Sequence, residues 1–112
     1  MPNQISKLID SLNRAWLHRT NQELGACQDL FSEISLELGI PLQGISERIF
    51  IDTNSETVNV LADYVLLAAS LLRAERKIKE SKLLVQLVQK TFEARSIPLP
   101  FQLHLQKGNN FL

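Results

Sequence analysis

The sequence is poor in the residues that build active sites and metal centres. Its single cysteine, Cys27, excludes an internal disulfide. Its two histidines, His18 and His104, have no cysteine or carboxylate at the spacing of metal ligands. The four glycines are scattered, so the sequence contains no glycine-rich loop of the kind that cradles phosphates. We therefore expect a protein that is not an enzyme and that binds no metal and no cofactor.

Long hydrophobic runs are also missing. No apolar run reaches the ~18 residues that a membrane-spanning helix needs, and the opening residues Met-Pro-Asn-Gln lack the basic and apolar stretches of a signal peptide. The 45% apolar and 21% charged fractions are ordinary for a soluble globular domain. Since a lone cysteine fits a reducing compartment, we expect a cytoplasmic protein with no membrane partner.

Two apolar stripes with the same spacing are the strongest structural signal. Each steps by three, four, three and four residues, which places five side chains on one face of an α-helix. The stripes are Leu24, Cys27, Phe31, Ile34 and Leu38, and Val58, Leu61, Val65, Ala68 and Leu72. They predict an all-α fold, an antiparallel bundle of four main helices with a short linking helix and an apolar C-terminal arm. Cys27 is expected to be a buried thiol.

Local signals place the predicted helices along the chain. We expect helices over 3–18, 22–38, 54–76 and 81–95, and a short helix or linking turn over 42–51. Gly39 is expected to end the second of these helices, and Thr53 to Glu56 is a candidate capping box. Segment 73–82 contains no glycine or proline, so a turn near Lys79 and a continuous helix both remain open, with the turn favoured. Ser81 would then cap the last helix.

The final residues follow a pattern that differs from the helical spacing of the rest of the chain. Apolar and other residues alternate from Ile97 to Gln106, which predicts an extended arm with one apolar face. A short helix with Pro100 in its first turn and Gly108 after its end is the alternative. We predict a bundle domain over 1–95 and an arm over 96–112 that packs on the bundle or on a partner subunit. The residues predicted for self-association are Leu99, Phe101, Leu103 and Leu105.

The charges are separated along the chain although they cancel overall. Eight acids and one base lie between Thr20 and Asp63, whereas seven bases and three acids lie between Arg73 and Arg95. Such separation is typical of surfaces that attract oppositely charged partners, including a second copy of the chain. The residues predicted to bind an acidic partner are Arg73, Arg76, Lys77 and Lys79.

A second signal concerns DNA. Residues 35–40 followed by Ile45 carry a small residue, a glycine and apolar residues at the offsets of a helix-turn-helix. Separately, residues 45–51 followed by Thr57 and Val58 resemble the central stretch of LuxR-type helix-turn-helix domains, which implies a DNA-binding regulator. The implied recognition helix, residues 56–69, contains no lysine or arginine, although DNA affinity depends on phosphate neutralisation.

These observations favour a non-enzymatic function. We expect a small helical regulator or adaptor that acts by binding another protein and that forms a homodimer. Two alternatives stay open, a DNA-binding transcriptional regulator with a degenerate helix-turn-helix, and a chaperone-like, immunity or antitoxin protein. No residue pattern in the sequence identifies the partner.

Overall fold

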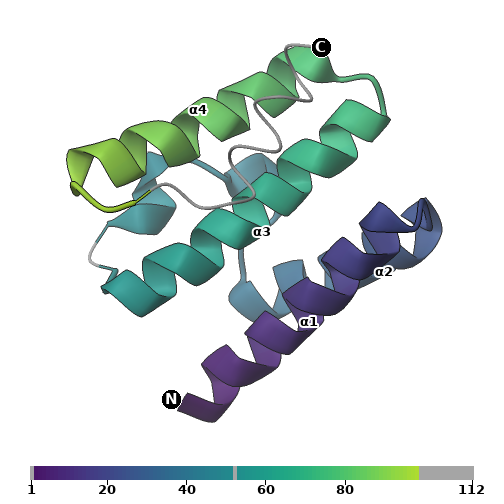
Figure 1. The fold of residues 1–112 in the computed structure, drawn as a ribbon, viewed down its shortest axis with the longest axis horizontal. Helices are drawn as coiled ribbons and strands as arrows, with labels where there is room; N and C mark the ends of the chain where they lie inside the picture. The colour runs from purple at the N-terminus through teal and green to yellow at the C-terminus, as the bar shows by residue number, and fades with distance from the viewer. Residues whose placement is uncertain (1, 52, 99–112) are drawn as a thin grey trace. The chain divides into compact units, whose positions relative to one another are not determined.

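A computed structural model describes residues 2–51 and 53–98, with side chains from residue 5 onward. These residues are helical, with no strand among them, and the prediction of an all-α class is confirmed. The elements, drawn in Figure 1, are α1 (Pro2–Thr20), α2 (Leu24–Leu38), the 3₁₀ turns η1 (Leu42–Gly44) and η2 (Glu47–Phe50), α3 (Ser55–Ala74) and α4 (Ile78–Ala94).

The chain divides into two compact units, Met1–Gly44 and Ile45–Leu112. The first unit contains α1 packed on α2, and the second contains α3 packed on α4, with η2 in contact with both α3 and α4. The predicted linking helix over 42–51 is therefore two separate 3₁₀ turns, one in each unit. The division of the chain into a domain over 1–95 and an arm over 96–112 stays a prediction.

The first unit has a small apolar core. Its buried apolar side chains are Leu8, Leu12 and Ala15 from α1 and Cys27 and Ile34 from α2. Helix α2 begins two residues later than the sequence indicated, because Gln22 has a left-handed φ of 62° that separates the two helices.

The end of α2 confirms the prediction made from Gly39. This glycine has a φ of 71°, and its N–H donates to the carbonyls of Ser35 and Leu36 at 2.9 and 3.3 Å. The N–H of Ile40 also donates to Ser35, at 3.2 Å. These bonds satisfy carbonyls that have no partner inside the helix, in the manner of a left-handed helix cap.

Helix α3 provides most of the core of the second unit. The apolar stripe predicted from Val58 to Leu72 is buried, and so are Tyr64 and Leu67 beside it, which have no exposed area. Its cap differs from the expected capping box. The Asn54 side chain accepts the N–H of Thr57 at 2.8 Å, while the Thr53 hydroxyl donates to the carbonyl of Phe50 at 2.7 Å.

The predicted turn after α3 is present but lies earlier than expected. Arg76 has a φ of 65°, and the N–H of Lys77 donates to the carbonyl of Leu72 at 2.8 Å, so α4 already begins at Ile78. The prediction that Ser81 caps the last helix is wrong. Ser81 lies inside α4, fully buried, and its hydroxyl donates to the carbonyl of Ala69 in α3 at 2.7 Å. A small hydroxyl residue opposite Ala69 lets the two helix backbones approach closely.

One described helix is long and apolar enough to cross a membrane by length and composition. This helix is Ser55–Ala74, with a mean hydropathy of 1.4 over a window that is 72% buried inside the protein. Burial of this extent is what a core helix of a soluble protein also shows.

Candidate interaction surface

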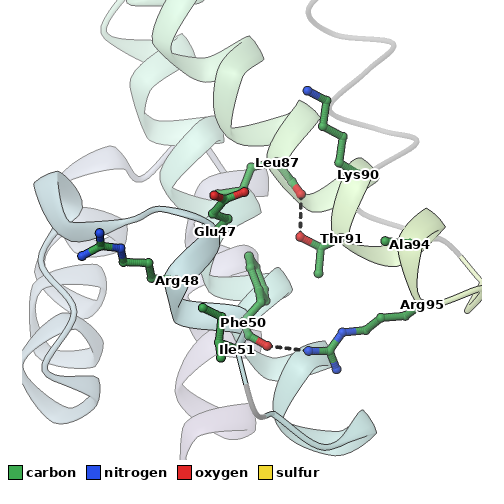
Figure 2. Close-up of a pocket in the computed structure, with 9 residues that line it drawn as sticks. All are labelled: Glu47, Arg48, Phe50, Ile51, Leu87, Lys90, Thr91, Ala94 and Arg95. Atoms are coloured by element: carbon green, nitrogen blue, oxygen red, sulfur yellow. Dashed lines mark hydrogen bonds between the residues drawn. The ribbon is translucent and has the colours of Figure 1, made fainter.

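An open groove lies between η2 and α4, within the second unit. Its volume is about 530 Å³, and Figure 2 shows the side chains that line it. The lining residues are Glu47, Arg48, Phe50, Ile51, Leu87, Lys90, Thr91, Ala94 and Arg95. We call this feature the η2–α4 groove.

Arg95 joins the two walls of the groove. Its guanidinium reaches from the end of α4 to the carbonyl of Phe50, as Figure 2 shows. It also donates to the carbonyl and to the hydroxyl of Thr53, both at 2.9 Å. These bonds to a charged donor hold the residues between η2 and α3 against the end of α4.

The wall from η2 presents an exposed apolar residue to the groove. Phe50 is buried, but Ile51 is 63% exposed. The reason is that η2 ends at Phe50 and Ile51 continues in an extended conformation.

The wall from α4 carries a second, partly exposed apolar stripe. Leu83, Leu87 and Ala94 follow one another along one helix face, with Lys90 between the last two. Leu83 is 60% exposed, whereas Leu87 is half-buried. The opposite face of α4, with Val85, Val88 and Phe92, is buried. Apolar surface that a helix leaves open beside a groove is typical of a protein-binding site.

Positive charge dominates the rim of the groove. Arg48 and Lys90 are exposed and Arg95 is half-buried, while Glu47 is the single acid in the lining. The partners of Arg95 are neutral oxygens, so they satisfy its hydrogen bonds without cancelling its charge. In Figure 2 the amino group of Lys90 points away from η2.

The four bases predicted to bind an acidic partner lie outside this groove. Arg76, Lys77 and Lys79 are exposed in and after the turn between α3 and α4, whereas Arg73 is half-buried in the last turn of α3. Lys77 forms an ion pair with Glu75 at 3.6 Å. The structure thus brings three exposed bases together at one turn, and their role in binding stays a prediction.

The four apolar residues predicted for self-association lie outside the described residues, so their prediction is unchanged. Sequence reasoning missed the groove, because it is formed by segments about forty positions apart, as the bond from Arg95 to Thr53 illustrates. The exposed stripe of α4 was the available signal. Leu83 and Leu87 are separated by one turn, on a different face from Val85 and Val88.

Other reactive groups form no cluster in the described chain. Burial raises the pKa of the Cys27 thiol, an effect that the charge of Arg19 partly opposes. Nδ1 of His18 lies 3.1 Å from Oε1 of Glu23, beside the turn between α1 and α2. No three His, Cys, Asp or Glu side chains among the described residues are arranged to hold a metal ion.

The helix that the LuxR-type resemblance assigns to DNA recognition lies within α3. Most side chains of α3 are buried, among them Val58, Val65 and Tyr64. A recognition helix needs an exposed face that enters the major groove of DNA. Because most of its side chains are buried in the described structure, α3 is not suited to DNA recognition.

No protein-family model, no curated protein and no solved structure matches this chain. The groove, its exposed apolar residues and its basic rim are therefore the observations from which a function is argued.

Proposed function

We propose that this protein is a non-enzymatic binding module, a small cytoplasmic regulator or adaptor that acts by binding protein. The observation that carries the proposal is the η2–α4 groove, in which exposed apolar side chains lie beside a basic rim. The exposed Ile51 and Leu83 add apolar surface that hydrophobic contact with a partner would remove from water.

The chemistry of the groove favours an acidic amphipathic helix as its partner. A row of apolar side chains spaced by one helical turn would contact Ile51 and Leu87, in the way that helices bind apolar grooves. Carboxylates on either side of that row would face Arg48 and Lys90. These rim charges are exposed, so they contribute to orientation and to the association rate more than to affinity.

The proposal includes a homodimer whose four main helices form an antiparallel bundle within each chain. The separation of acidic and basic segments along the sequence supports self-association. The tail residues Leu99, Phe101, Leu103 and Leu105 are proposed to add apolar contacts to the dimer. The bases Arg73, Arg76, Lys77 and Lys79 are proposed to bind a further acidic partner.

Self-association of the full chain tests the proposal. We expect sedimentation equilibrium to give a dimer at low salt, and Ile51→Asp to weaken the dimer because it places a carboxylate on apolar contact surface. Leu17→Asp is the matched control, since Leu17 in α1 is 59% exposed and lies outside the groove. Equal weakening by both substitutions would remove the groove from the proposal. A monomer at every concentration would overturn the homodimer.

The tail is tested separately in the full chain. Phe101→Asp should weaken the dimer further if the tail adds contacts, because Phe101 lies on the apolar row of residues 97–105. His104→Asp places the same charge on the alternate row and is its control. No difference between these two variants would remove the tail from the dimer contact.

A further inference from the structure

Helix α2 carries an apolar and acidic surface that complements the groove. Its outward side holds Leu36, which at 85% is the most exposed large apolar side chain among the described residues. Asp29, Glu33 and Glu37 are exposed on the same helix, spaced at four residues, and α2 contains no base. None of these three carboxylates forms an ion pair with another described residue. Helix α2 is therefore apolar and acidic toward solvent.

From this complementarity we infer that the η2–α4 groove binds helix α2 of a second copy of the chain. Leu36 would contact the apolar side chains of the groove, the exposed Ile51 and the half-buried Leu87. Glu33 and Glu37, one helical turn apart, would face Arg48 and Lys90 on the rim. This inference rests on the proposed homodimer and names the contact that forms it.

The dimensions of the two partners agree. Helix α2 has 15 residues, which corresponds to a length of roughly 22 Å. The α4 wall of the groove, from Leu87 to Arg95, extends over roughly 12 Å at the same rise per residue. Helix α2 is therefore long enough to span this wall.

The contact is reciprocal in a symmetric dimer. Each chain presents one α2 and one groove, so a two-fold axis would place each α2 in the partner's groove and satisfy both surfaces. An arrangement that does not close would produce longer chains of molecules as concentration rises. Both arrangements use the same contact, and the molar mass distinguishes them.

Charge reversal on the two surfaces tests the contact in the full chain. The α2 variant is Glu33→Lys with Glu37→Lys, and the groove variant is Arg48→Glu with Lys90→Glu. Each is expected to weaken self-association about ten-fold at low salt, because two attractions become repulsions at exposed sites. An equimolar mixture of the two variants should associate nearly as well as the wild-type chain, because both contacts of the mixed dimer are then complementary.

A matched control separates this contact from net charge. Asp10→Lys with Glu56→Lys changes the charge by the same amount as the α2 variant, at two exposed acids outside α2 and outside the groove. By itself this control should associate as the wild-type chain does, because its α2 and its groove are unchanged. Its mixed dimer with the groove variant has the same opposite net charges but only one complementary contact, so it should form more weakly than the mixed dimer of the two reversal variants. Equal restoration by this control would overturn the inference. Circular dichroism of each variant establishes that it is folded.

The outcomes also separate this inference from the proposed function. If the groove variant weakens association while the α2 variant does not, the groove binds another part of the chain and only the inference about α2 fails. If the wild-type chain is monomeric at low salt, the homodimer and the inference fail together. If both reversals weaken association and their mixture restores it, the contact between α2 and the groove is established.

Discussion

The two helix pairs of this protein differ in how much of each helix is buried. In the pair of α1 and α2 the buried residues are few and leave Leu17 and Leu36 exposed. In the pair of α3 and α4, α3 is buried along most of its length, and α4 adds Val85, Val88 and Phe92. The difference indicates that the second pair holds most of the stabilising apolar core. The first pair has fewer buried residues, and its helix α2 carries three exposed acids and no base.

The largest effect is expected from Phe92→Ala. Phe92 is fully buried on the face of α4 that packs on α3, so truncation removes apolar contacts and leaves a cavity. We expect the free energy of unfolding to fall by about 4 kcal/mol, measured by urea unfolding followed by far-ultraviolet circular dichroism. Leu83→Ala is the control on the exposed face of the same helix and should change stability little. A similar loss in both variants would contradict the assigned core face.

Trp16 sharpens the comparison in the same experiment. It is the single tryptophan of the sequence and lies in α1, so its fluorescence follows the first pair. If the Trp16 signal in Phe92→Ala moves with the circular dichroism signal, the two pairs unfold as one cooperative unit. If the midpoint of the Trp16 transition stays at the urea concentration found for the wild-type chain, the two pairs unfold as separate units.

The next largest effect is expected from Arg95→Ala. Its guanidinium donates to Phe50 and Thr53, and bonds from a charged donor contribute roughly 1.5–3 kcal/mol each to stability. Since Thr53 still donates to the Phe50 carbonyl, we expect a loss of about 2 kcal/mol. Arg95→Lys should recover only part of it, because an ammonium cannot reproduce the planar fork. Lys90→Ala, on the exposed rim, should be nearly neutral, and a loss equal to that of Arg95→Ala would contradict the bridging role.

The features predicted from sequence were those that depend on near neighbours. Helical spacing predicted the all-α class and the buried stripe of α3. Gly39 predicted the end of α2, because glycine readily adopts the left-handed conformation that follows a helix. Ser81 was misplaced because its partner, the carbonyl of Ala69, belongs to another helix. The groove was missed for the same reason, since Arg95 and Thr53 meet only in the folded chain.

Gly25 in α2 and Gly39 after its end should respond in opposite directions to replacement by alanine. Gly39 has a φ of 71°, so Gly39→Ala forces a side chain into the left-handed region and should cost about 1 kcal/mol. Gly25 lies in the first turn of α2 with no atom within 4 Å of an added Cβ, so Gly25→Ala should stabilise by up to about 1 kcal/mol. Thermal unfolding of both variants checks the pair. The same sign in both would contradict the conformations assigned to them.

The smallest expected effect concerns the first pair and is measured as the pH dependence of its stability. Burial raises the pKa of the Cys27 thiol above its ordinary value of 9.0, so the folded chain keeps the proton after the unfolded chain has released it. The unfolded state then binds fewer protons, and the stabilising contribution of Cys27 is lost as pH rises through and above the ordinary thiol value. Urea unfolding at a series of pH values should therefore show a steeper decline for the wild-type chain than for Cys27→Ala, because the other titrating groups are shared. Parallel declines would mean that α1 and α2 do not keep this thiol from water, and the first pair would then have an even smaller core than its buried residues indicate.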